Sequence, residues 1–291
     1  MTVADTLSSY FDIEEHDTTL RTEVLAGITT FLTMSYIVVV NPAIMTGIPS
    51  AKKPGIVLAS YSPGQVQQML AVVTIISAAI ATLVMAFYAK RPFAQAPGLG
   101  LNAFFAFTVV GALKIHWQTA LAAVVTEGII FILLTAVGAR RYIIELFPEP
   151  VKLAVGTGIG LFLTIIGLEQ MHIVASDPAT LVTLGGVASD PVAIVAVLGL
   201  LLTFALYAAD VRGSIIIGIL STTVIGWVVT AVGLVPANAG LTATWQAPMY
   251  NISPLAGAFL SGFGNVDGFA FALIVFTFFF VDFFDTAGTL T

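Results

Sequence analysis

The sequence predicts an all-α polytopic membrane protein, and two features of its composition support this prediction. Of its 291 residues, 58% are hydrophobic and only 9% are charged, with a mean hydropathy of +1.03. Soluble domains contain roughly 45–50% apolar and about 25% charged residues, so a water-soluble globular fold is excluded. The apolar, charge-poor stretches are also numerous enough for eight spanning helices, each of which needs about 20 residues.

The composition also narrows the classes of function. Ten Lys and Arg against 16 Asp and Glu give a net charge of −6, which argues against nucleic acid as a partner. The chain has no cysteine, which excludes disulfides, thiolate catalysis and cysteine-ligated metals. His16, His116 and His172 lie far apart in the sequence, so we expect no metal site.

Eight apolar stretches follow an acidic N-terminal segment at residues 1–23. That segment contains FDIEEHDTTLRTE, which lacks the basic start of a cleaved signal peptide. The predicted spans lie at residues 24–41, 70–88, 99–113, 119–138, 153–168, 191–209, 214–235 and 268–291. We expect Asn41 and Pro42 to end the first span, because proline removes a backbone donor. Residues 236–267 form a long loop before the last span.

The basic residues predict the orientation in the membrane. If the N-terminus is cytoplasmic, the inner segments contain seven basic residues and the outer loops three. The inner ones are Arg21, Lys90, Arg91, Arg140, Arg141, Lys152 and Arg212, and the outer ones are Lys52, Lys53 and Lys114. This distribution follows the positive-inside rule. It predicts a multi-pass protein with residues 1–23 in the cytoplasm and residues 236–267 outside. We expect this protein in the plasma membrane.

The third span begins unusually, with RPFAQAPGLGLNAFFAF at residues 91–107. Its two prolines disfavour a helix, and Gly98 and Gly100 permit unusual backbone dihedrals. We therefore expect an extended entry and then a helix that begins inside the membrane near Leu101 or Asn102. Transporters use such helix N-termini to hold polar groups of the substrate. The alternative is a re-entrant loop that closes a packing gap.

A glycine-rich run, VGTGIGLFLTIIGLEQ, contains Gly156, Gly158 and Gly160. It lacks the Lys-Ser/Thr pair and the preceding strand of a phosphate-binding loop. Close helix packing at small residues explains it better.

Three carboxylates lie inside predicted spans, where a charged side chain costs about 2.5–3.5 kcal/mol and so marks a functional candidate. Glu127 lies midway along the fourth span, and Asp282 and Asp285 share one face of the last span. Asp285 precedes Thr-Ala-Gly-Thr, a small and polar patch suited to lining a cavity. The structural alternative for Glu127 and Asp282 is a protonated side chain that hydrogen-bonds a neighbouring helix.

An intramembrane aspartyl protease also has two membrane aspartates. Those aspartates face each other from different helices, however, whereas Asp282 and Asp285 lie on one helix. The Gly-x-Gly-Asp pattern of such proteases is absent as well. We therefore expect no enzymatic activity.

Three segments resemble signatures of the nucleobase–cation symporters, in the xanthine/uracil permease superfamily. They are LRTEVLAGITTFLTMSYIVVVNPAIM at residues 20–45, APGLGLNAFFAF at 96–107 and VDFFDTAGTL at 281–290. The branch that they resemble contains the hypoxanthine/guanine and adenine permeases. The resemblance implies a purine nucleobase permease that works by proton- or cation-coupled symport, with H⁺ or Na⁺ as the co-transported ion and no other cofactor.

The resemblance also implies a fold of two inverted seven-span repeats, in which the third span pairs a short strand with a half-helix. Residues 24–235 would form the first repeat, and residues 268–291 would be the eighth span. Three residues are carried over to the substrate site and three to the coupling site. These are Asp285, Asn102 and Phe104 for the substrate, and Asp285, Asp282 and Glu127 for the cation or proton.

Members of this family have fourteen spans, whereas this sequence ends at Thr291. The resemblance is therefore expected to cover an N-terminal half only. The alternatives are a transport-inactive truncated remnant and a membrane subunit whose second half comes from another polypeptide. The expected partners are a purine nucleobase and the lipid bilayer, and it stays open whether the chain forms a homodimer as its relatives do.

Overall fold

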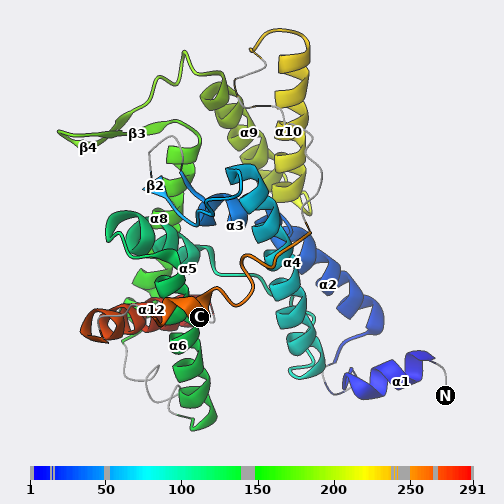
Figure 1. Ribbon diagram of the computed structural model, residues 1–291. Helices are drawn as coiled ribbons and strands as arrows, with labels where there is room; N and C mark the ends of the chain where they lie inside the picture. The colour runs from blue at the N-terminus through cyan, green and yellow to red at the C-terminus, as the bar shows by residue number, and fades with distance from the viewer. Residues whose placement is uncertain are drawn as a thin grey trace.

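The computed structural model is mostly helical, and a helix lies at each of the eight predicted spans (Figure 1). The structure describes residues 3–13, 15, 17–48, 53–138, 148–236, 239, 241, 250–264 and 268–289. Among these residues, five helical segments are long and apolar enough to cross a membrane, and two apolar helices are shorter. The total of eight spans and the inverted repeat stay predictions.

The long spans comprise α2 with α3, then α4, α6, α9 and α10. The helices are α1 (Val3–Tyr10), α2 (Leu20–Met34), α3 (Ile37–Met45), α4 (Pro63–Phe87), α5 (Leu99–Ala103), the π-helical η1 (Phe104–Ala112), α6 (Trp117–Ala136), α8 (Glu149–Gln170), α9 (Pro191–Ala208), α10 (Ser214–Ala231), α11 (Phe259–Gly262) and α12 (Gly268–Thr289). The strands are β1 (Gly47–Ile48), β2 (Lys53–Pro54), β3 (Val174–Asp177) and β4 (Leu181–Leu184).

Two short antiparallel hairpins, β1–β2 and β3–β4, depart from the all-α prediction. Both lie in loops between spans. The turn of the second hairpin is closed by Asp177, whose Oδ1 accepts hydrogen bonds from the backbone N–H groups of Ala179 and Thr180. These hydrogen bonds also lower the pKa of the Asp177 carboxyl. A side-chain acceptor of this kind favours a tight turn, and the turn brings the flanking residues into register as strands.

The first span is longer than predicted and contains Asn41 and Pro42. After a turn at Ser35 and Tyr36, α3 continues to Met45 with Pro42 inside it and with Asn41 buried. The prediction that these residues end the span is therefore wrong. Proline is tolerated in a membrane helix where neighbouring helices satisfy the freed polar groups, and α3 packs closely against α4.

The third span has the extended entry that the prolines predict. Residues 91–98 contain neither helix nor strand, and α5 begins at Leu99, slightly earlier than expected. The short strand is not found in this segment, and side chains of the neighbouring helices bind its backbone. The N–H of Ala94 donates to Thr30 Oγ1 on α2 at 3.2 Å, and the N–H of Gln95 donates to Thr82 Oγ1 on α4 at 2.9 Å.

The glycine-rich run is helical, as predicted, and forms part of α8. A Cβ atom at Gly158 or Gly160 would meet nothing within 4 Å, so the predicted close packing at these two glycines is not found in the described structure. The close approach is made instead by Ile159, whose Cγ2 lies 3.2 Å from where a Cβ of Gly100 on α5 would stand. The glycine on the partner helix, rather than those on α8, permits this contact.

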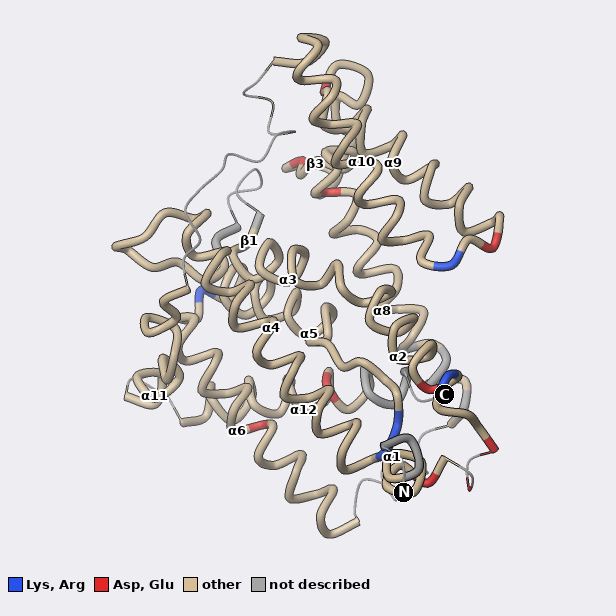
Figure 2. Tube along the Cα trace, turned by 90° about the vertical axis from the view of Figure 1, so that its right-hand side faces the viewer, with Lys and Arg blue, Asp and Glu red and all other residues tan. Residues whose placement is uncertain are grey.

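Helices α9 and α10 stand side by side in Figures 1 and 2 and pack through two reciprocal glycine–threonine contacts. A Cβ atom at Gly199 would lie 2.3 Å from Thr222 Oγ1, and one at Gly218 would lie 2.1 Å from Thr203 Oγ1. Small residues let helix backbones approach closely in a membrane. Large apolar side chains stay exposed on the outer faces of the pair, as expected beside lipid. They include Leu198, Leu201, Phe204, Leu220, Val224 and Val228.

Replacing Gly218 with Ala should destabilise this helix pair, because the new methyl group overlaps the Thr203 side chain. Overpacking of this kind costs on the order of 1–3 kcal/mol. Thermal unfolding of the purified protein in detergent measures the effect. The double variant Gly218→Ala/Thr203→Gly should recover most of the loss, and Gly27→Ala, where the added Cβ meets nothing within 4 Å, should leave the melting temperature unchanged. A Gly218→Ala protein as stable as the parent would show that the two helices do not pack this way.

Candidate functional site

Helix α12 contacts the elements that carry most of the predicted site residues. It packs against α5, α6 and α8. Phe278 on α12 is fully buried, and its ring meets Phe104 edge-on with centroids 5.5 Å apart and lies 6.3 Å from Phe105. Phe104, predicted to lie beside the substrate, is thereby held against α12 at the start of η1.

The structure pairs two predicted carboxylates across helices. Glu127 on α6 is 3% exposed, and its carboxyl group lies close enough to that of Asp282 on α12 for the two to interact. Figure 2 shows acidic positions along both helices, whereas most other charged positions lie in turns or near helix ends. A carboxylate has only acceptors, so a hydrogen bond between two carboxyl groups requires a proton on one of them.

One atom of this pair is left without a partner. The Oε1 atom of Glu127 is buried and accepts no hydrogen bond among the described residues. A buried polar atom without a partner costs free energy, so the position of this atom calls for a physical explanation. The sequence predicted both carboxylates as candidates, but it did not predict that they meet.

Asp285 follows Asp282 by three residues on α12. Its side chain, like those of Thr286 and Thr289, lies outside the described residues. The predicted contact of Asp285 with the substrate and its role in coupling therefore stay predictions.

Asn102 lies half-buried in α5 and belongs to a polar network that joins three spans. Its Nδ2 donates to Asn41 Oδ1 on α3 at 2.6 Å, and Asn41 Nδ2 donates to Thr74 Oγ1 on α4 at 2.9 Å. From the sequence, Asn41 is expected to end a helix, and Thr74 does not stand out from the other residues of its span. The signal that was available is the position of Asn41 within the apolar run IVVVNPAIM, because a polar residue inside a span needs a hydrogen-bonding partner.

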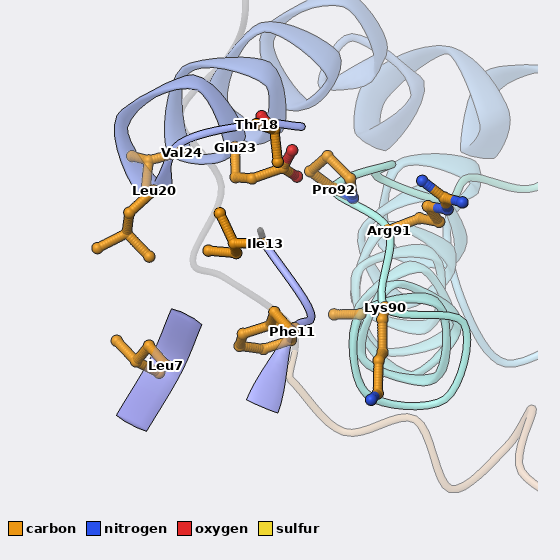
Figure 3. A pocket seen from close by; sticks show the side chains of 11 residues that line it. Leu7, Phe11, Ile13, Thr18, Leu20, Glu23, Val24, Lys90, Arg91 and Pro92 are labelled. Atoms are coloured by element: carbon orange, nitrogen blue, oxygen red, sulfur yellow. The ribbon is translucent and has the colours of Figure 1, made fainter. Parts of the chain in front are cut away.

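A cavity of about 280 Å³ lies apart from these residues, between the N-terminal segment and the turn after α4 (Figure 3). Its lining is mostly apolar and includes Phe11, Ile13 and Val24, with Lys90 and Arg91 at its edge. None of the predicted substrate or coupling residues lines it. This cavity is therefore not the predicted substrate site.

Next to this cavity, an ion pair joins the N-terminal segment to the turn after α4. The Lys90 ammonium pairs with Asp12 and lies 5.6 Å from the centroid of the Tyr10 ring. The hydrogen bond with Asp12 raises the pKa of Lys90. The contact places the N-terminal segment at the same end of the molecule as this turn.

A second cavity of about 340 Å³ lies beside the β3–β4 hairpin. Here His172 Nδ1 lies 2.7 Å from Asp190 Oδ2, and Asp190 Oδ1 caps α9 by accepting from the N–H of Val192 at 2.8 Å. The hydrogen bond from His172, followed by that from Val192, lowers the pKa of Asp190. In the part of the chain that the structure describes, no three His, Asp or Glu side chains gather as a metal site would require.

Comparison with known sequences identifies relatives of this chain. The permease family model, which represents xanthine and uracil permeases, matches residues 21–291. The putative permease MJ0326 of Methanocaldococcus jannaschii is 40% identical over 287 residues, which cover 98% of this chain and 60% of that protein. The guanine/hypoxanthine permease PbuG of Bacillus subtilis is 37% identical over 284 residues, covering 98% and 61%. The adenine permease AdeP of Escherichia coli is 35% identical over 286 residues, covering 98% and 58%.

These alignments bear on the expected extent of the resemblance. The chain spans 58–61% of the length of the three relatives. The expectation that the resemblance covers an N-terminal half only is not confirmed, since the relatives align with 98% of this chain. The matches and the apolar helices identify a multi-pass membrane protein of a permease family. The chain belongs to the xanthine/uracil permease family.

Proposed function

We propose that this protein carries purine nucleobases (hypoxanthine, guanine or adenine) across the plasma membrane by proton-coupled symport. The relatives named for guanine, hypoxanthine and adenine support the substrate class. The observation that supports the coupling is the proximity of the Glu127 and Asp282 carboxyl groups where α6 packs against α12. Such a pair can take up and release a proton. Coupling to protons therefore needs no cage of oxygen ligands of the kind that selects Na⁺.

The proposed substrate site lies around α5 and α12. A purine presents ring N–H donors and carbonyl or ring-nitrogen acceptors along its edges. The amide of Asn102 can donate and accept, and the carboxylate of Asp285 can accept. A site that hydrogen-bonds such an edge rejects bases that lack the matching groups far more strongly than an apolar pocket does. The start of η1 at Phe104 supplies the adjoining wall, held in place by Phe278.

Coupling follows from the position of the carboxyl pair, because one of its members, Asp282, lies on the helix that also carries Asp285. A charge within a span is costly, so the pair favours the state in which it retains a proton while the site is closed to water. Opening to the outside allows the pair to take up a proton, and opening to the cytoplasm allows it to release one. In alternating access, one bundle moves against another around such a site.

The proposed orientation places the N-terminus in the cytoplasm. The Lys90–Asp12 contact brings the N-terminal segment to the same end as the turn after α4, as two consecutive spans require. Lys90 and Arg91 therefore lie on the same side as Arg21, which is the side that the positive-inside rule assigns to the cytoplasm.

Uptake of labelled bases tests the proposed transport. Cells that lack their own purine permeases and express the gene for this chain should take up hypoxanthine, guanine or adenine. Asp285→Asn should reduce this uptake at least roughly tenfold, because a neutral amide replaces the proposed charged acceptor. Asp210→Asn, in the exposed turn after α9, serves as the matched control and should keep parental uptake. Full uptake by Asp285→Asn contradicts the role of Asp285, and no uptake by the parent favours a transport-inactive membrane protein.

Glu127→Gln tests the coupling separately. Glutamine retains the shape of Glu127 and can hydrogen-bond Asp282, but it cannot take up a proton. Proton entry that depends on added base, measured with an intracellular pH indicator, should fall at least roughly tenfold. The base affinity of the purified protein should stay within twofold of the parent. Glu15→Gln, outside the spans, is the control, and normal base-dependent acidification by Glu127→Gln would rule out the carboxyl pair as the coupling site.

A further inference from the structure

In the hydrogen bonds around Asn41, the donor and the acceptor can be assigned from the chemistry of the groups involved. The Thr74 hydroxyl donates its one hydrogen to the backbone carbonyl of Leu70 at 2.7 Å. Its oxygen must therefore act as the acceptor towards Asn41, 2.9 Å away. This requirement places the NH₂ group of Asn41 towards Thr74 and leaves the Asn41 Oδ1 towards Asn102.

The same reasoning then orients Asn102. Because Asn41 presents an acceptor, the group of Asn102 that lies 2.6 Å from it must be its NH₂. The Oδ1 and NH₂ groups of an asparagine are assigned from the hydrogen-bond network that surrounds them, and this network begins at a backbone carbonyl that can only accept. The Oδ1 of Asn102 thus accepts no hydrogen bond from the described residues and is free to accept one from a ligand.

We propose that Asn41 and Thr74 are positioning residues that determine which group Asn102 presents to the substrate. This inference rests on the proposed function, in which Asn102 contacts a purine. Thr74 orients Asn41, Asn41 orients Asn102, and Asn102 offers a carbonyl oxygen to a ring N–H of the base. Bases are then selected for a donor at this position, although neither Asn41 nor Thr74 touches them.

Burial supports this assignment. Asn41 is 6% and Thr74 2% exposed, so neither side chain can exchange its partner for water. The energetic cost of an unpaired polar group in this environment keeps the chain of hydrogen bonds in a single arrangement. Without Thr74 Oγ1, the Asn41 amide would have no anchor and could rotate by 180°, which would reverse the group that Asn102 presents.

The chain contains a matched control for simple helix packing. Gln67 on α4 donates to Thr46 Oγ1 at the end of α3 at 3.1 Å, and the Thr46 hydroxyl donates to the carbonyl of Pro42 at 3.0 Å. This second link joins the same two helices and has the same chemistry. It does not lead to Asn102. Its removal therefore measures what the loss of a hydrogen bond between α3 and α4 does by itself.

The experiment measures the dissociation constant for hypoxanthine with the purified full chain in detergent. Thr74→Val keeps the side-chain shape and should weaken binding roughly fivefold, which corresponds to one hydrogen bond. Thr74→Ser restores the hydroxyl and should bind within twofold of the parent, as should Gln67→Leu. In the Asn102→Ala background, Thr74→Val should have no further effect, because the residue through which it acts is absent. Melting curves without base show that each variant is folded, and Asn41→Leu provides a second variant with the same expected pattern.

Three results would overturn the assignment. In the first, Thr74→Val and Asn41→Leu bind hypoxanthine as tightly as the parent. In the second, Gln67→Leu weakens binding as much as Thr74→Val does. In the third, Thr74→Val weakens binding equally in the parent and in the Asn102→Ala background. The second and third results would identify the network as a packing contact between helices. If the unmodified chain binds none of the three purines, the proposed function fails, and this inference fails with it.

Discussion

The constraint that shapes this protein is the absence of water in the hydrocarbon core, where each polar group needs a partner within the protein. The extended segment before α5 shows the consequence most directly. Its backbone donors cannot be satisfied within a helix, so threonines of α2 and α4 accept hydrogen bonds from Ala94 and Gln95. Non-helical backbone is therefore stable here only because two spans hold it. The start of α5, and with it Asn102, takes its position from this arrangement.

The same constraint explains why the polar residues of the spans occur in pairs and chains. Asn41, Thr74 and Asn102 hydrogen-bond across three helices, and Glu127 and Asp282 lie beside each other across two. In water each of these contacts would contribute little. Within a membrane each one orients a group whose alternatives are costly. Polar side chains that would make ordinary contacts in a soluble protein therefore have a fixed orientation here. A fixed orientation suits them to recognise a ligand or to hold a proton.

Helix α12 connects these elements. It contacts the half-helix α5 through the aromatic contact of Phe278 with Phe104 and contacts α6 through the carboxyl pair. A movement of α12 relative to α6 would separate Glu127 from Asp282 and would change the support of Phe104 at the same time. In the proposed function, this shared dependence on α12 would link proton binding to substrate binding.

The sequence by itself determined the membrane class, the positions of the helical spans and the irregular start of the third span, because hydropathy, charge and proline act locally along the chain. Its motifs also indicated the family, and Glu127 and Asp282 stood out as charges in apolar runs. Only the tertiary structure decided that Asn41 is a buried hydrogen-bonding residue rather than a helix end, that Glu127 meets Asp282, and that Gly100, rather than Gly158 or Gly160, permits the contact between α5 and α8. These facts depend on which helices are neighbours. In a bilayer, a polar group or a small residue acquires its role from the partner that packs against it, and the order of residues along one chain segment does not contain that partner.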